Sequence, residues 1–581
     1  MLLEKLREYS ERLDLPPRLY SELPVRYIIE LDREGRALSK ELIDTADPSN
    51  SATKRGTRRL TPSLQRSVGI KPLLLTDKAD YVLGYVPDDG KPGRVAQCHA
   101  AFVDLVRRCA KATGEPAVHA VVAFLERGPL TQIEPDQDFD PGALIAFRVD
   151  GENPTALPPV QAFWAAENDP ARGSAPMMQC IICGSQRPAL ERLELKVKGV
   201  PGGQSSGTSI ISFNAEAFES YGLTASLNAP TCSDCGERFT KAVNELLASS
   251  DACVRLQNVA YVFWTKERQS DTPFAALLNE ANPEQVKQLY ESVFTGAGST
   301  AVREFDTEPF YAAALSGSGG RCVVREWIDT TIGEAQRQLA RWFQMQRIIQ
   351  LTQFGPEVAA PMPLRQLAYA TVRTGDHNNP APANVSRALL RTALTGAPLP
   401  HDLLYQAVRR CRAEQSVTRP RAALIKMVLL SQRRDFNPEE EETMVELDET
   451  NKDPAYLCGR LLAVLEQAQR AALPGINATI VDRFYGTASS APASVFGRLM
   501  RGVQPHLARL ERDRRGAWVT IQRRLEEVQA DLRTYPRTLT LEQQGLFALG
   551  YYHERARRWT KAADSDTNNV EEPQAGDHEQ E

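Results

Sequence analysis

Two pairs of cysteines have the spacing of metal ligands. Cys180 and Cys183 form one CxxC pair, Cys232 and Cys235 form another, and 48 residues separate the two pairs. Four thiolates make a closed tetrahedral zinc site with no open position for water, which favours a structural role over a catalytic one. Four reduced thiols in a core are the alternative. The remaining six cysteines are isolated in the sequence and are predicted to be small core residues.

The segment between the pairs is rich in glycine and small polar residues. Residues 198–222 read KGVPGGQSSGTSIISFNAEAFESYG, and no acidic residue occurs from Leu195 to Ala215. Glycine lets the backbone come close to a ligand, and hydroxyls, amides and bare N–H groups suit phosphate oxygens and base edges. We therefore predict a loop that contacts a polynucleotide. A solvent loop without a ligand is the alternative.

No convincing catalytic site accompanies this loop. Gly202 and Gly207 stand in the GxxxxG frame of a nucleotide-binding loop, but Thr208 occupies the place of the lysine that must reach the phosphates. His401 and Asp402 form an HD dipeptide, but the chain has only seven histidines and lacks further ligands at a recognisable spacing. An enzyme, most plausibly a metal-dependent nuclease, stays open as an alternative.

Composition indicates a globular protein with several domains. A chain of 581 residues is too long for one core. Its 42% hydrophobic and 25% charged residues are typical of a soluble protein. No apolar run approaches the roughly 20 residues that span a bilayer, and the start MLLEKLREYSERL indicates an amphipathic helix and not a signal peptide. We therefore expect a cytoplasmic protein.

The net charge of −5 conceals two basic regions. Residues 48–76 contain no acid, and their length and interspersed hydroxyls favour a phosphate-binding arm over a solvated basic loop. A second region is an arginine-rich helical face near the C-terminus, for which a salt-bridged solvated face is the alternative. The candidate backbone contacts are Lys54, Arg55, Arg58, Arg59, Lys196, Lys198, Arg498, Arg501, Arg515, Arg523 and Arg524.

Hydrophobic periodicity predicts an α+β protein, with a mixed N-terminal α/β region, a zinc-ribbon-like insertion and a C-terminal all-α bundle. Strands are expected at residues 27–31, 73–75, 81–83 and 143–149, and a hairpin at 310–327. The predicted parts are an N-terminal domain (1–175), the glycine-rich segment framed by the cysteines (176–260), a mixed then mainly helical domain (261–433), a helical bundle (444–561) and a disordered acidic tail (562–581).

Four stretches resemble a known family. They are the glycine-rich segment followed by SLNAP at residues 226–230, YVLGY at 81–85, NATIVDRFYGTASSAPASVFGRLM at 477–500, and GLFALGYYHER at 545–555. Together they resemble the large subunit of the type I-C CRISPR Cascade, over nearly the whole chain except the acidic tail. The family pattern does not demand the two CxxC pairs, so the zinc prediction depends on spacing alone.

The resemblance implies a non-catalytic subunit of an RNA-guided DNA surveillance complex. Such a subunit reads the PAM on duplex DNA, helps to open the duplex for guide pairing and helps to recruit a helicase-nuclease. A glycine loop with amides fits the narrow minor groove. The residues expected near the PAM are Gly202, Gly203, Gln204, Ser205, Ser206 and Asn214, with Lys71 and Lys78 as groove or phosphate contacts.

The implied partners are the crRNA, target double-stranded DNA, the backbone and 5′-end subunits, the small subunit and the helicase-nuclease. The C-terminal bundle resembles the small subunit, which the family can make separately from an internal start. Met444 precedes the bundle, so residues 444–581 are the candidate product. A zinc-stabilised scaffold that binds only protein is a further alternative function.

Overall fold

The computed structural model describes residues 1–50, 53–64, 69–87, 90–170, 175–193, 195–266, 274–290, 307–352, 355–376, 381–433 and 444–557. The predicted acidic tail (562–581) lies outside these ranges. The chain forms two compact units. Unit 1 contains Met1–Ala248 and Gly317–Val323, and unit 2 contains Ser249–Ser316 and Val324–Glu581. No helix among the described residues is both long and apolar enough to cross a membrane.

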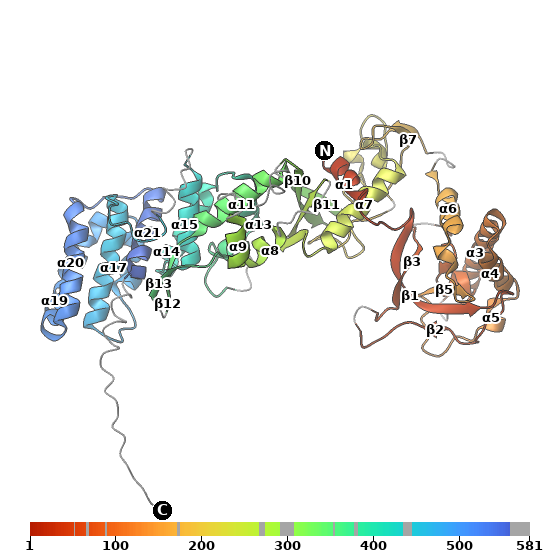
Figure 1. The fold of residues 1–581 in the computed structure, drawn as a ribbon, viewed down its shortest axis with the longest axis horizontal. Helices are drawn as coiled ribbons and strands as arrows, with labels where there is room; N and C mark the ends of the chain where they lie inside the picture. Colours follow the sequence, from red (N-terminus) through yellow and green to blue (C-terminus); the bar gives the residue numbers. More distant parts are fainter. Residues whose placement is uncertain are drawn as a thin grey trace, which may run out of the picture. The chain divides into compact units, whose positions relative to one another are not determined.

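Unit 1 is built on a sheet whose central strand is β1 (Tyr20–Leu31). β1 pairs in parallel with β5 (Leu144–Val149) and antiparallel with β2 (Ile43–Asp44) and β3 (Thr57–Pro62), and β4 (Thr76–Asp77) pairs with β5. A parallel pair needs a long crossover. The crossover here contains α2 (Ala79–Val82), α3 (Pro92–Thr113), α4 (Pro116–Glu126) and α5 (Pro129–Gln132), and α6 (Pro158–Glu167) follows β5 (Figure 1).

The predicted strands at residues 27–31 and 143–149 are confirmed as parts of β1 and β5. The strands predicted at 73–75 and 81–83 are wrong. The carboxylate of Asp77 accepts hydrogen bonds from the Leu73 and Lys78 N–H groups, both at 2.8 Å, and Leu75 has a φ of 56°. These local bonds satisfy backbone groups that a strand would use for pairing. Tyr81 instead lies in α2.

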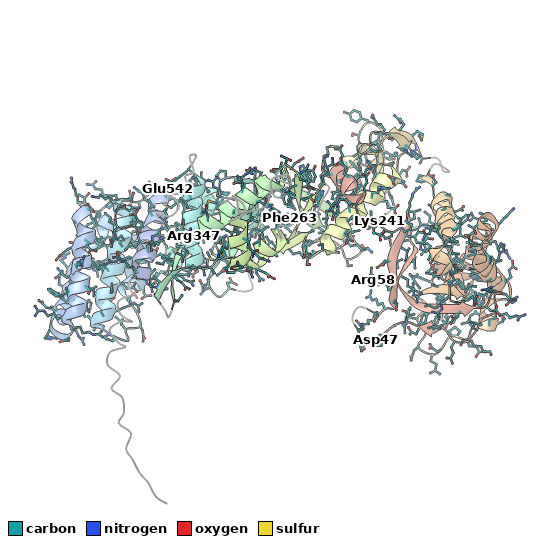
Figure 2. The ribbon with its side chains drawn as sticks, viewed as in Figure 1. Asp47, Arg58, Lys241, Phe263, Arg347 and Glu542 are labelled. Atoms are coloured by element: carbon teal, nitrogen blue, oxygen red, sulfur yellow. The ribbon has the colours of Figure 1, made fainter. Side chains whose placement is uncertain are left out.

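The N-terminal helix α1 (Leu2–Ser10) packs on α7 (Ser233–Ala248) in unit 1. A nearly buried ion pair on α7 holds the chain that follows α1. Glu237 pairs with Lys241 at 2.6 Å and also accepts the Leu19 N–H at 2.9 Å. The Lys241 ammonium, labelled in Figure 2, donates to the Pro16 and Pro17 carbonyls, whose residues have no N–H to offer in return.

Unit 2 begins with an antiparallel sheet in the order β11-β10-β9-β8. One face of the sheet contributes Phe263 and Phe310 to the core, where Phe274 packs 4.7 Å from Phe310 between ring centroids. The hairpin predicted at residues 310–327 is confirmed. The elements are β8 (Cys253–Leu256), β9 (Val259–Thr265), α8 (Phe274–Glu280), α9 (Pro283–Tyr290), β10 (Pro309–Ser318), β11 (Arg321–Thr331) and α11 (Ile332–Gln346).

A helical region follows, interrupted by one short hairpin. The hairpin consists of β12 (Ile349–Thr352) and β13 (Gly355–Val358). The helices are α12 (Leu364–Tyr369), α13 (Ala383–Thr395), α14 (His401–Glu414), α15 (Arg419–Ser431), α17 (Pro454–Ala472), α18 (Ile480–Ala488), α19 (Phe496–Asp513), α20 (Arg515–Asp531) and α21 (Leu541–Arg557). The predicted fold class, α+β with a C-terminal helical bundle, is confirmed. The division into five parts stays a prediction.

Helix α17 is the centre of the C-terminal bundle and packs against α19, α20 and α21 (Figure 1). Two glycines let α17 and α21 approach closely. A Cβ atom on Gly459 would lie 2.0 Å from the Phe547 carbonyl oxygen, and one on Gly550 would lie 2.2 Å from the Tyr456 carbonyl oxygen. Helix α21 also packs on α14 and α15, where Gly545 faces Leu404 and Ile425. One continuous core therefore runs from the sheet to the last helix.

Substitution Gly459→Ala tests this close crossing. Alanine favours a helix over glycine by about 1 kcal/mol, but its methyl group would meet backbone atoms of α21 and force the helices apart. We expect a net loss of about 1–3 kcal/mol in the free energy of unfolding, measured as a lower midpoint in calorimetry. Gly502→Ala is the matched control, because no atom lies within 4 Å of its Cβ position in α19. An unchanged midpoint for Gly459→Ala would contradict the crossing.

Candidate functional site

The structure brings the two cysteine pairs together. The four sulfur atoms of Cys180, Cys183, Cys232 and Cys235 lie within 4.8 Å of one another. The first pair lies on the hairpin of β6 (Met177–Gln179) and β7 (Gln186–Pro188), and Cys235 lies in the first turn of α7. The Cys232 N–H donates to the Cys180 sulfur at 3.5 Å. This four-cysteine cluster could hold a metal ion.

The geometry and the thiol chemistry both fit zinc. Tetrahedral Zn–S bonds of about 2.3 Å place neighbouring sulfurs about 3.8 Å apart, and Cys183 Sγ lies 4.0 Å from Cys232 Sγ. A hydrogen bond from Cys235 is the largest cause that lowers the pKa of Cys232, to about 5. The thiolate is the form that binds metal. Burial raises the pKa of Cys180, a cost that a bound cation would offset.

The glycine-rich segment forms a loop that is closed at its base. Val197 and Thr208 exchange two backbone hydrogen bonds of 2.8 Å each, and we call residues 198–207 between them the glycine loop. Asn244 on α7 accepts the Lys198 N–H at 2.8 Å and donates to the Lys196 carbonyl at 3.1 Å. The helix that carries Cys235 therefore also fixes the base of the loop.

The glycines in the loop serve chain packing. The loop lies against Gly317–Val323, which we call the hairpin tip and which belongs to unit 1. The Gly317 N–H donates to the Pro201 carbonyl at 2.7 Å, and the Gln204 N–H donates to the Gly319 carbonyl at 3.1 Å. A Cβ atom on Gly317 would lie 2.1 Å from the Gly203 nitrogen. Only glycine permits two backbones to come this close.

Packing on the hairpin tip leaves the polar side chains of the loop in solvent. Gln204, Ser205 and Ser206 are exposed, as is Gly202, whereas Gly203 is half-buried. Residues 203–207 spell GQSSG, with the spacing of a serine hydrolase motif. They lie in a loop and lack the strand-to-helix turn that presents such a nucleophile.

Asn214 and Arg321 form a second exposed polar group in unit 1. The Arg321 guanidinium donates to the Asn214 side-chain oxygen and lies 4.2 Å from the centre of the Phe218 ring. Sequence reasoning included Asn214 but missed Arg321, because Arg321 lies 107 positions further along the chain. The only signal in the sequence is a second glycine cluster just before it, at Gly317, Gly319 and Gly320.

Tyr221 is another residue that sequence reasoning missed. Its side chain is 98% exposed, and its backbone has a φ of 54°, in the left-handed region. Asn228 holds the turn, because its side chain accepts the Ser220 N–H at 2.9 Å and donates to the Leu223 carbonyl at 2.8 Å. Left-handed backbone at a residue other than glycine is uncommon and costs energy. The structure therefore presents a fully exposed aromatic side chain on a turn whose backbone is held by Asn228.

The predicted basic arm is partly a strand. Arg58 and Arg59 lie on β3, and the Arg58 guanidinium, labelled in Figure 2, donates to the Glu22 carbonyl at 2.9 Å. Lys54 and Arg55 are exposed in the turn before β3. Lys71 and Lys78, the expected groove contacts, are also exposed, and Lys78 is the N-cap residue of α2.

The arginines of the C-terminal bundle fall into two groups. Arg523 pairs with Glu527 at 3.0 Å, and Arg524 pairs with the buried Glu554 at 2.5 Å and is itself 14% exposed. Others in the predicted set are exposed with no carboxylate within ion-pair distance among the described residues. These are Arg498, Arg501 and Arg515. The Arg498 guanidinium lies 5.3 Å from the centre of the Phe484 ring.

A family model described as CRISPR-associated protein (Cas_Csd1) matches residues 3–559. The chain belongs to this family. The predicted resemblance to the type I-C Cascade large subunit is thereby confirmed. A search of curated proteins gave no match.

The four-cysteine cluster of this Cas_Csd1 chain predicts a metal content of one zinc per molecule. Changing Cys183 and Cys232 together to serine should abolish the bound zinc, measured by mass spectrometry of the metal. It should also lower the thermal midpoint by at least about 5 °C, because the metal stabilises only the folded state. Cys253→Ser, which changes a lone buried thiol, should leave the zinc content unchanged. Purified wild-type protein with less than a tenth of an equivalent of zinc per molecule would contradict the prediction.

The contact between the glycine loop and the hairpin tip makes a second prediction for the Cas_Csd1 chain. Gly317→Ala should push the loop away and expose the bond after Lys198 to trypsin. A local destabilisation of about 1.4 kcal/mol would speed cleavage tenfold. Gly320→Ala is the matched control, because its nearest neighbour is the flexible Gln204 side chain at 3.4 Å. Equal cleavage rates in the two variants would contradict the contact.

Proposed function

We propose that the chain is the non-catalytic large subunit of an RNA-guided type I-C surveillance complex that recognises the PAM in duplex DNA. In this proposal it also helps to open the duplex for guide pairing and to recruit the helicase-nuclease. Family membership supports the complex. The observation that carries the DNA contact is the glycine loop, which is fixed at its base and along one side while its polar side chains stay exposed.

The chemistry of the loop suits the minor groove. That groove is narrow and offers the acceptors adenine N3 and thymine O2, with the guanine amino group as its distinguishing donor. Gln204 supplies an amide that can donate and accept, and Ser205 and Ser206 supply hydroxyls. The segment from Leu195 to Ala215 contains no carboxylate that would repel the phosphates. Gly202, Gly203 and Asn214 complete the proposed PAM contacts.

Tyr221 supports the proposed opening step. An aromatic ring held in solvent can stack on a base that loses its partner, and such stacking is worth about 1–3 kcal/mol per base. Insertion of a side chain between base steps also kinks and unstacks a duplex. The hydrogen bonds of Asn228 hold the backbone of the turn, so only the side chain of Tyr221 has to be ordered on binding.

The basic residues are proposed to bind nucleic-acid backbone. Lys71 and Lys78 are proposed at the groove or its phosphates, with Lys54, Arg55, Arg58, Arg59, Lys196 and Lys198 as further contacts in unit 1. In the bundle, the proposed set is Arg498, Arg501, Arg515, Arg523 and Arg524, of which the first three make no ion pair with any residue that the structure describes. Phosphate contacts position the protein but do not read sequence.

Zinc is proposed as a structural cofactor of the four-cysteine cluster. The cation would hold β6–β7 to the start of α7, and Asn244 on the same helix fixes the base of the glycine loop. The proposed partners are the crRNA, target DNA, the other Cascade subunits and the helicase-nuclease. Residues 444–581 remain the proposed small-subunit product of an internal start.

The deciding experiment measures PAM recognition by the assembled complex. Target duplexes with a randomised flank are bound to the complex that contains this chain and its guide, and the enriched flank is then made as one labelled duplex. The double variant Gln204→Ala with Ser205→Ala should bind this duplex about tenfold more weakly, because two hydrogen bonds of about 0.5–1.5 kcal/mol each are lost.

The matched control removes two exposed amides from unit 2, Gln285→Ala with Gln288→Ala on α9, and should leave the affinity unchanged. Duplexes with a scrambled flank should bind wild type and both variants equally. Unchanged affinity of the loop variant for the enriched duplex would remove Gln204 and Ser205 from the PAM site. Metal-dependent cleavage of DNA by the isolated chain would contradict the non-catalytic assignment.

A further inference from the structure

A pocket in unit 2 lies outside every site discussed above. It has a volume of about 570 Å3, within the usual range for ligand pockets, and lies between β11, α13 and the start of α14. Arg325, Glu326, Arg387, Arg391 and Asp402 line it together with apolar side chains of α13, α14 and the intervening prolines. We call it the β11–α13 pocket.

The cations of the pocket converge from two elements. Arg387 and Arg391 are four residues apart on α13 and therefore lie on one face of the helix. Arg391 Nε lies 3.4 Å from Glu326 Oε1, and the Arg391 side chain is 62% exposed at the mouth of the pocket. Arg325 on β11 donates from Nε to the Ser316 hydroxyl at 2.7 Å, which fixes its guanidinium.

One polar atom of the pocket lining has no hydrogen-bond partner among the described residues. It is Glu326 Oε2, on a side chain that is 15% exposed. The other carboxylate oxygen, Oε1, faces Arg391 Nε at 3.4 Å. Burial is the main cause that raises the pKa of Glu326, and Arg391 and Arg387 lower it.

The arginines and the unpartnered oxygen of Glu326 together restrict which ligands the pocket can bind. Guanidinium groups bind phosphate in a forked geometry, but Glu326 and Asp402 would repel a simple anion. The free oxygen of Glu326 needs an N–H donor, and a buried acceptor without one costs about 1–3 kcal/mol. A suitable ligand therefore carries an anion at one end and an amino group at the other.

We infer that the β11–α13 pocket binds one unstacked nucleotide of a DNA single strand, with its phosphate at Arg387 and Arg391 and an amino group of its base at Glu326. Cytosine N4 and adenine N6 present amino groups, whereas thymine presents the O4 acceptor in the same place. The pocket therefore prefers cytosine over thymine. Pro398 and Pro400 also line the pocket and supply apolar surface for the face of the base in this inference.

This inference depends on the proposed function only in taking nucleic acid as the ligand. It concerns a strand after the duplex has opened, whereas the glycine loop concerns the closed duplex. The test therefore uses the full-length chain and labelled single strands of twelve deoxycytidines or twelve deoxythymidines, without a PAM. These two strands have the same length and charge and differ in the hydrogen-bonding edge and the C5-methyl group of thymine, so the Glu326→Gln variant below assigns the difference to the edge.

Fluorescence anisotropy should show about fivefold to tenfold tighter binding of the cytidine strand. Glu326→Gln keeps the volume but can both donate to O4 and accept from N4, so the preference should fall below twofold. Arg387→Ala with Arg391→Ala should lower the affinity for both strands at least fivefold. The slope of log affinity against log salt concentration should also become less steep, by about 0.7 per lost phosphate contact. Arg387→Lys with Arg391→Lys keeps the charge without the fork and should cause an intermediate loss.

The matched control is Arg409→Ala with Arg412→Ala, which removes the same charge from exposed positions of α14 outside the pocket. It should change both affinities by less than twofold. An equal effect of the control and the pocket variant would overturn the inference, as would a cytidine preference that survives Glu326→Gln. Competition by poly-glutamate as effective as competition by the cytidine strand would also overturn it, in favour of an acidic protein partner.

The same variants separate this inference from the proposed function. The double variant Gln204→Ala with Ser205→Ala should keep the cytidine preference while it loses affinity for the PAM duplex. Failure of the strand test with intact PAM recognition overturns the pocket alone. Loss of PAM dependence in the wild-type complex, together with a cytidine preference that requires Glu326, overturns the proposed function alone.

Discussion

The close contact between Gly203 and Gly317 is the constraint on which the arrangement of the glycine-rich segment depends. No side chain separates the two backbones at this point, so the loop follows the hairpin tip along hydrogen bonds that only the main chain supplies. The base of the loop is held by Asn244, on the helix whose first turn carries Cys235. A sequence typical of a flexible linker is thereby given a fixed outer surface, because Gly203 packs on the hairpin tip while the side chains of Gln204, Ser205 and Ser206 stay exposed.

The sequence predicted the parts of this site better than its internal contacts. Cysteine spacing correctly indicated that four thiols would meet, because the CxxC turn itself brings two sulfurs together. The glycines were interpreted as room for a ligand, which stays a prediction, and the sequence did not reveal that Gly203 also makes room for Gly317. Arg321 was missed because its contact with Asn214 joins residues that are 107 positions apart in the sequence. At residues 73–75, the apolar run suggested a strand, but the hydrogen bonds of Asp77 determine a different local backbone.

Charge patterns in the sequence also needed the structure for their interpretation. The acid-free run at residues 48–76 contains strand β3, so its arginines are spaced along an extended chain and one of them bonds to the neighbouring strand. In the bundle, Arg524 and Arg460 both pair with Glu554, which is 3% exposed. Such buried pairs are costly to break. A count of arginines could not distinguish these structural cations from Arg498, Arg501 and Arg515, which remain exposed.

Helix α21 completes two packing surfaces at once, against α17 through Gly459 and Gly550 and against α14 and α15 through Gly545. Because α21 (Leu541–Arg557) follows α14, α15 and α17 in the sequence, these surfaces stay open on the ribosome until α21 has been synthesised. Messenger truncations or stalled translation before Leu541 would leave both apolar surfaces uncovered. Such fragments would expose apolar surface of the kind that chaperones and proteases recognise, so the packing of one helix couples synthesis past Arg557 to survival of the chain.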